Sequence, residues 1–97
     1  MTMQNINPNA GLPEEERIAL WLRQYISRVL ALAEKDINPN TSFDNLGLDS
    51  SSAVAMTGDL ADWRGCTIDA SAAYDHPSIL KLSKAVAALP QRARQAA

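Results

Sequence analysis

Three consecutive serines, Ser50, Ser51 and Ser52, offer the most suggestive chemistry in this 97-residue sequence. They follow Asp49 and open a stretch whose apolar residues recur at helical spacing as far as about Trp63. The first backbone N–H groups of a helix have no intrahelical partner and favour side-chain oxygens and anions. A phosphodiester formed on Ser50 would therefore lie at the positive end of a helix dipole, a position worth about 0.3–1 kcal/mol at an exposed site.

Ser50 also has a simpler interpretation, as the cap of that helix. Either Asp49 or Ser50 can supply the cap, and the tetrapeptide Gly47-Leu48-Asp49-Ser50 taken alone favours a plain cap. Gly47 gives the backbone freedom to turn before the helix, and Leu48 is apolar enough to hold the loop against a core. Both interpretations place the serine at an exposed helix end.

The other polar residues do not indicate a catalytic site or a metal site. A serine hydrolase is excluded because the only histidine, His76, lies beside Pro77 in a turn and no Gly-x-Ser-x-Gly elbow frames the serines. One cysteine and one histidine cannot furnish three or four metal ligands. Cys66 is expected to be a small buried filler and Asp75 a turn-capping residue. We expect no enzymatic activity from the chain itself.

The elements that would position Ser50 are helices. Apolar periodicity predicts a first helix from Glu14 and a second from Ser50 to about Trp63. The predicted buried faces are Ile18, Trp21, Leu22, Tyr25, Val29 and Leu32 in the first helix, and Ala53, Met56, Leu60 and Trp63 in the second. The long connection 34–49 should be packed by its own apolar side chains, which are Ile37, Phe43, Leu46 and Leu48.

Two further helices are predicted after Gly65, a plausible C-cap of the second helix. Asp69 is expected to cap a short third helix that runs through about Tyr74. Ser78 is expected to cap a fourth helix, which Pro90 would stop. The predicted buried face of this fourth helix is Ile79, Leu82, Val86 and Leu89.

Length indicates one small domain, and the helical patterns make it all-α. The expected domain covers residues 14–89, between a flexible lead, residues 1–13, and a flexible tail, residues 90–97. The net charge of −2 and the lack of a Lys/Arg-rich run before the tail argue against nucleic-acid binding. No stretch resembles a signal peptide or a membrane span, and a single cysteine allows no intramolecular disulfide. The expectation is a cytoplasmic monomer.

Two motifs carry a resemblance to a known family. Gly47-Leu48-Asp49-Ser50 is similar to the Gly-x-Asp-Ser signature that opens the second helix of acyl carrier proteins. Residues 68–78, with the turn Tyr74-Asp75-His76-Pro77, look like the short third helix and the entry to the fourth in polyketide synthase carriers. The resemblance covers residues 14–89 and implies a four-helix bundle, with three longer helices, a short third one and a long first loop.

The resemblance implies that Ser50 carries a covalent 4′-phosphopantetheine arm. A phosphopantetheinyl transferase that recognises Asp49 would install the arm from coenzyme A. The arm's thiol would hold acyl or polyketide intermediates as thioesters, in polyketide or fatty-acid biosynthesis. Besides the transferase, the implied partners are an acyl-loading ligase or acyltransferase and a ketosynthase or other synthase domains.

One side of the second helix is expected to meet these partners. The residues that continue the side of Ser50, here called the partner face, are Ser51, Val54, Ala55, Gly58 and Asp62. Acidic residues are sparse there, so attraction to partners should be weaker than in the acidic fatty-acid carriers. Two alternatives stay open, a peptidyl carrier of a nonribosomal peptide pathway and an unmodified helical adaptor. Leu48 and Asp49 before the serine favour the polyketide or fatty-acid side.

Overall fold

The computed structural model describes residues 13–90, which form five α-helices and one 3₁₀ turn. In chain order these are α1 (Glu14–Leu30), η1 (Glu34–Asp36), α2 (Phe43–Leu46), α3 (Ser50–Arg64), α4 (Ala72–Asp75) and α5 (Ile79–Ala87). The all-α prediction is confirmed, since the strand-like pairing within residues 13–90 is a single isolated bridge between Ser42 and Ser78. Except for Pro13 and Pro90, the predicted lead and tail lie outside the described residues.

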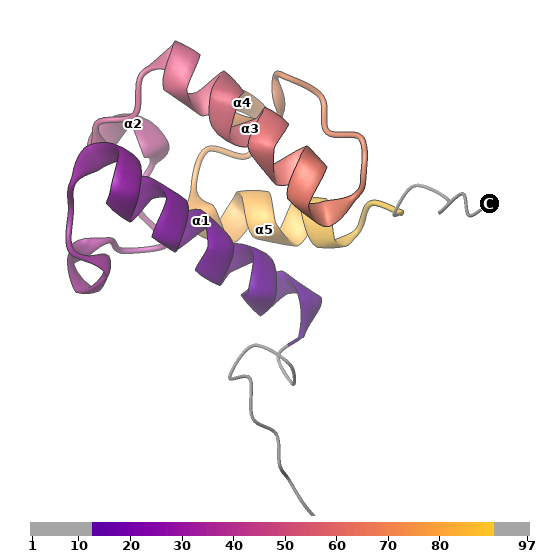
Figure 1. Ribbon diagram of the computed structural model, residues 1–97, viewed down its shortest axis with the longest axis horizontal. Helices are drawn as coiled ribbons and strands as arrows, with labels where there is room; N and C mark the ends of the chain where they lie inside the picture. The colour runs from indigo at the N-terminus through magenta and orange to yellow at the C-terminus, as the bar shows by residue number, and fades with distance from the viewer. Residues whose placement is uncertain (1–12, 91–97) are drawn as a thin grey trace, which may run out of the picture.

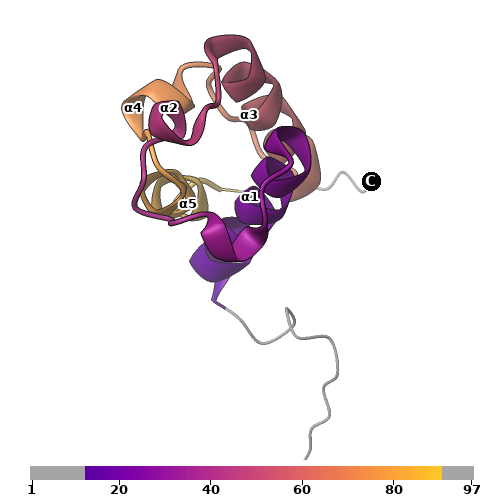
Figure 2. The ribbon, with the colours of Figure 1, turned by 90° about the vertical axis from the view of Figure 1, so that its left-hand side faces the viewer.

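The helices pack as a small bundle around one core. The contact between α1 and α5 is the most extensive in the bundle, and Figure 1 shows these two helices crossing beneath α3. In the view turned by 90°, all five helices surround a common centre (Figure 2). None of the helices in the described part of the chain is long and apolar enough to cross a membrane.

The core combines a buried stripe from each long helix with side chains from the connections. In α1, Ile18, Leu22 and Ile26 follow one another at four-residue spacing and have no exposed surface. The whole buried set is Ile18, Leu22, Ile26, Ile37, Phe43, Leu48, Met56, Leu60, Cys66, Ala73, Ile79, Leu82 and Val86. The faces predicted from periodicity supply most of these residues, so the helical interpretation of the sequence is confirmed.

The end of α1 differs from the prediction. Val29 is 47% exposed, because it lies in the last turn beyond the buried Ile26. The helix ends at Leu30, its C-cap Ala31 has a left-handed φ of 55°, and the Leu32 N–H donates to the Ser27 carbonyl at 3.1 Å. Leu32 therefore packs against the core from outside the helix rather than as part of its buried face.

Trp63, predicted to be buried on α3, is 43% exposed. Its ring stacks on Trp21 of α1 with centroids 5.6 Å apart, and the Arg17 guanidinium carbon lies 5.8 Å from the Trp63 centroid. The buried position at this end of α3 belongs to Arg64, whose Nη1 lies 2.6 Å from Glu14 Oε2. Adjacent helical residues point about 100° apart, so a modest rotation of α3 from the predicted orientation turns Arg64 inward and Trp63 outward.

The long connection is packed by its own side chains, as predicted, and it contains a helix that the sequence did not reveal. Ile37, Phe43 and Leu48 are buried at its two ends and middle. Phe43 begins the one-turn helix α2, which Ser42 caps by accepting the Asn45 N–H at 3.1 Å. Four residues are too few to show a helical period.

The third predicted helix begins later than expected, and the fourth begins as expected but ends earlier. The short helix α4 starts at Ala72 rather than next to Asp69, whose carboxylate instead accepts the N–H and O–H of Ser71 at 3.0 and 2.9 Å. The predicted cap of α5 is confirmed, because Ser78 Oγ accepts the Lys81 N–H at 3.2 Å. Leu89 lies beyond the end of α5.

Gly47 and Gly58 form a matched pair for testing how α2 is joined to α3. A Cβ at either glycine would meet no atom within 4 Å, but Gly47 has a left-handed φ of 105° while Gly58 lies inside α3. Gly47→Ala should lower the free energy of unfolding by roughly 1–2 kcal/mol, the cost of a left-handed L-residue. Gly58→Ala should raise it by about 0.5–1 kcal/mol through helix propensity. Urea denaturation measures both, and a stabilising Gly47→Ala would contradict the assigned turn.

Candidate functional site

Ser50 is the first residue of α3 and is exposed. The cap of this helix is Asp49, whose Oδ1 accepts the Ser52 N–H at 2.9 Å. Ser51 Oγ also lies 3.5 Å from the same oxygen. Among the hydrogen bonds within residues 13–90, none engages the Ser50 hydroxyl. Of the two capping candidates in the sequence, Asp49 takes the structural role and leaves Ser50 available.

The capping hydrogen bonds hold the pKa of Asp49 below its ordinary value of 3.8. The largest cause is the Ser52 backbone N–H, followed by the hydroxyl of the same residue and then that of Ser51, with slight burial opposing them. The cap therefore adds stability at any pH above 3.8, and this contribution is lost as the pH falls through the lowered pKa. At neutral pH a fully charged carboxylate lies directly before Ser50.

The loop before Ser50 is held in place by buried side chains and backbone hydrogen bonds. Phe43 and Leu48 are each 4% exposed. The Leu48 N–H donates to the Phe43 carbonyl at 2.9 Å, and the Phe43 N–H donates to the Pro77 carbonyl at 2.8 Å. These contacts join the loop to the turn between α4 and α5, so the start of α3 has a fixed place on the bundle.

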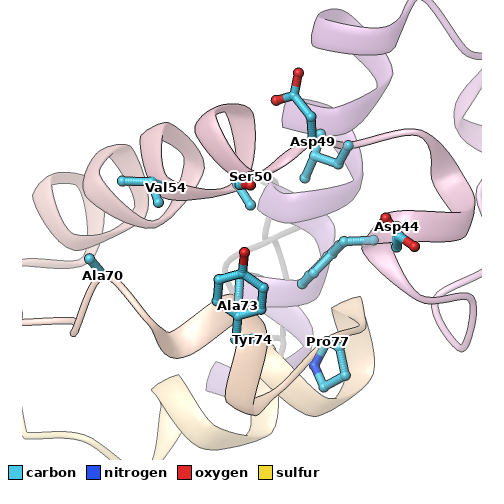
Figure 3. Close-up of a pocket in the computed structure, with 11 residues that line it drawn as sticks. Asp44, Asp49, Ser50, Val54, Ala70, Ala73, Tyr74 and Pro77 are labelled. Atoms are coloured by element: carbon cyan, nitrogen blue, oxygen red, sulfur yellow. The ribbon is translucent and has the colours of Figure 1, made fainter.

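A cavity of about 370 Å³ opens beside Ser50, among α2, α3 and α4 (Figure 3). Ser50, Asp44 and Asp49 are polar, exposed members of its lining, and its other side chains are mostly apolar. The lining residues are Phe43, Asp44, Leu48, Asp49, Ser50, Ala53, Val54, Ala70, Ala73, Tyr74 and Pro77. Three of these are alanines, whose small side chains leave the space that larger residues would fill.

The residues of the partner face are all exposed. Ser51 and Val54 line a second, shallow hollow together with Asp49 and Ser50. Val54 is 46% exposed. Among the exposed residues near Ser50 on α3, it has the largest apolar side chain. The other members, Ala55, Gly58 and Asp62, continue along the exposed surface of the same helix. The role of this face in binding enzymes stays a prediction.

The other reactive residues lie away from this arrangement. Cys66 is fully buried in the core, as expected of a small apolar filler. His76 lines a different cavity, of about 400 Å³, which adjoins α5 and does not include Ser50. Asp75 Oδ2 lies 3.5 Å from Ser71 Oγ, in keeping with a role in the turn. No cluster of three or more potential metal ligands occurs among residues 13–90.

Sequence reasoning missed the far wall of the cavity. Ala70, Ala73 and Tyr74 come from the segment around α4 and line the side of the cavity opposite α3 (Figure 3). The turn Tyr74-Asp75-His76-Pro77 is the available signal, but the sequence indicates only a resemblance to polyketide synthase carriers and the entry to the last helix. Its contact with the start of α3 depends on tertiary packing, which periodicity does not report.

Comparisons with known proteins agree with this geometry. The family described as "Phosphopantetheine attachment site" matches residues 20–86. The acyl carrier protein TtuC of Teredinibacter turnerae is 38% identical over 73 residues, which cover 75% of this chain and 84% of that protein. The mycoketide-CoA synthase of Mycobacterium tuberculosis is 35% identical over 77 residues, 75% of this chain but 2% of the synthase. In such synthases the chain corresponds to a small part of a much longer protein.

Solved structures show the same architecture. The HMG-ACPI domain of the CurA module from Lyngbya majuscula superposes with a TM-score of 0.72 and 27% identity, covering 88% of this chain and 86% of that one. A free-standing peptidyl carrier protein from Acinetobacter baumannii gives a TM-score of 0.71 over 77% of this chain and 94% of that one, and at 23% identity it supports the fold alone. The chain therefore belongs to the phosphopantetheine attachment family, as an acyl carrier protein.

Proposed function

We propose that Ser50 is the residue that receives 4′-phosphopantetheine. The observation that carries this proposal is the division of roles at the start of α3, where Asp49 accepts the capping hydrogen bond and Ser50 stays exposed without one. Ser51 is directed toward Asp49, and the half-buried Ser52 contributes the capped N–H. Of the three adjacent hydroxyls, that of Ser50 has the least competition from the protein itself.

The attachment is a group transfer catalysed by a separate phosphopantetheinyl transferase. Ser50 Oγ forms a bond to the phosphorus that bears pantetheine, the pyrophosphate bond of coenzyme A breaks, and adenosine 3′,5′-bisphosphate leaves. The serine proton passes to a base of the transferase. The phosphodiester then lies at the N-terminus of the 15-residue helix α3, where the dipole favours negative charge. When bound, the group supplies the thiol that holds an acyl chain as a thioester.

Asp49 is proposed to serve recognition as well as capping. Its carboxylate is exposed, and its lowered pKa keeps it charged throughout the neutral range. Asp44, which also lines the cavity, adds a second exposed carboxylate. A transferase with basic residues beside its active site would meet both charges when it approaches Ser50.

The cavity next to Ser50 is proposed to shelter the carried chain between visits to partner enzymes. Its wall is mostly apolar, so it suits an acyl chain better than a polar one. The visiting enzymes are proposed to be an acyl-loading ligase or acyltransferase and a ketosynthase or other synthase domains of polyketide or fatty-acid biosynthesis. Each would bind briefly through the partner face, as small transient interfaces allow.

The chain is proposed to catalyse no step of this chemistry itself and to act as a monomer. A thiol-terminated arm has to stay reduced in order to be loaded, and the cytoplasm is the compartment that keeps thiols reduced. We therefore assign its work to the cytoplasm.

Attachment at Ser50 predicts a specific change in mass. Incubation with coenzyme A and a broad-specificity transferase should add one phosphopantetheinyl group to the folded chain, and Ser50→Ala should abolish the gain. Ser51→Ala and Ser52→Ala are the matched controls, and both should keep the gain. Intact-mass spectrometry measures all four proteins. No gain in any of them would support the unmodified adaptor, and a gain that survives Ser50→Ala would move the site to a neighbour.

If the partner face binds the transferase, Val54 should affect the attachment of the arm whereas Val29 should not. These two valines are 46% and 47% exposed, but Val54 adjoins Ser50 and Val29 lies at the end of α1. Val54→Asp should lower kcat/KM of the transferase by about tenfold, the effect of losing a contact worth about 1.4 kcal/mol. Val29→Asp should leave it unchanged. Thermal unfolding of both variants separates lost recognition from lost folding, and equal loading rates would argue against the face.

A further inference from the structure

The cavity beside Ser50 offers few side-chain hydrogen-bond donors. Eleven residues line it, and of these only Ser50 and Tyr74 carry a side-chain O–H or N–H group. Asp44 and Asp49 present carboxylates, which accept hydrogen bonds when ionised and cannot donate them. Attachment of the arm replaces the hydrogen of the Ser50 hydroxyl with phosphorus. Once the arm is attached, the Tyr74 hydroxyl is therefore the one side-chain hydrogen-bond donor left among these eleven residues.

Tyr74 is unusual among the aromatic residues in its exposure. It is 71% exposed, more than any other exposed large apolar side chain in residues 13–90. Figure 3 shows its ring extending from α4 toward α3, with the hydroxyl on the side of the cavity where Ser50 lies. The backbone beneath it is held, since the Tyr74 N–H donates to the Ser71 carbonyl at 2.9 Å and the neighbouring Ala73 is buried.

We propose that Tyr74 is a specificity-determining residue, whose hydroxyl donates a hydrogen bond to a carbonyl oxygen of the carried chain and so lets the cavity hold 3-oxoacyl chains, which an apolar lining alone would disfavour. The inference rests on the proposed attachment at Ser50 and deepens it by naming a class of cargo. A saturated chain offers the cavity only methylene groups beyond its thioester. A 3-oxoacyl chain adds a carbonyl acceptor near the thioester, and that acceptor would lose its water partners in an apolar cavity unless a donor replaced them.

The other residues that line the cavity suit a chain that is apolar except for one carbonyl group. Ala53, Ala70 and Ala73 provide the apolar space, while Tyr74 provides a donor at the edge of that space. A donor inside the cavity would need a permanent partner in the unloaded protein, because buried polar groups are costly when unsatisfied. At 71% exposure, the Tyr74 hydroxyl can bond to water in the unloaded protein and exchange that water for the cargo.

The test compares Tyr74→Phe with the original chain after loading. Tyr74→Phe keeps the ring and removes only the hydroxyl. The transferase attaches hydrolysis-resistant amide analogues of the arm that carry either a hexanoyl or a 3-oxohexanoyl chain labelled with ¹³C at C3. In the original chain, the C3 carbonyl signal should shift toward its hydrogen-bonded position, and Tyr74→Phe should abolish this shift. The sheltered fraction of the 3-oxo chain, read from the amide signals of the three cavity alanines, should fall roughly two- to tenfold. The hexanoyl chain should show no difference.

The other tyrosine of the chain, Tyr25, provides the matched control. The Tyr25 hydroxyl donates to Asp59 Oδ2 at 2.8 Å, and Tyr25 does not line the cavity, so Tyr25→Phe should leave the C3 signal unchanged. An equal change in the alanine amide signals when Tyr74→Phe carries an arm with a bare thiol would assign the hydrogen bond to the arm's own amides and overturn the proposal. An unchanged C3 signal in loaded Tyr74→Phe would overturn it alone. Failure of Ser50 to take up any arm would overturn the proposed function together with this inference.

Discussion

The position of Ser50 depends on one set of backbone contacts between distant segments. The Phe43 N–H donates to the Pro77 carbonyl at 2.8 Å, and the Leu80 N–H donates to the Pro39 carbonyl at 3.1 Å. These hydrogen bonds fix the long connection to the turn that starts α5, and the buried Phe43 side chain fills the space beneath them. Without this junction, the loop that leads into α3 would have no fixed place on the bundle, and one wall of the cavity would be lost.

The polar residues at the start of α3 show how neighbouring side chains divide their roles. Asp49 satisfies the Ser52 N–H, which otherwise would need a different oxygen at the helix end. The cap is the charged Asp49, one residue before Ser50. Ser50 is therefore the first residue of the helix, and its side chain is not needed as the cap. Gly47, at a φ of 105°, brings the chain from α2 to this cap within two residues. The helix is thus capped by Asp49, and the Ser50 hydroxyl takes no part in the cap.

Much of this could be predicted from the sequence, and the failures have a common physical cause. Helical spacing identified Leu22 and Leu60 as buried, and local chemistry identified the Ser78 cap. Periodicity gives the direction of a side chain but not the position of its neighbours, which is why Val29 and Trp63 were wrongly placed in the core. The helix α2 is too short to show a helical period, and the residues on the far wall of the cavity are brought to Ser50 by contacts between remote segments, which periodicity does not report. Attachment at Ser50 itself follows from the family motif and stays a proposal.

The bundle distributes its packing unevenly, and the uneven distribution suits a carrier. The extensive contact of α1 with α5 provides a stable side, whereas α3 and the short α4 touch over a much smaller region. The cavity lies on this sparsely packed side, where alanines replace larger residues. Elements with few buried contacts open at lower free-energy cost than the core, so the short α4 contributes less to the stability of the bundle than α1 and α5 do. A tightly packed α4 would add stability but would leave no space for cargo beside Ser50.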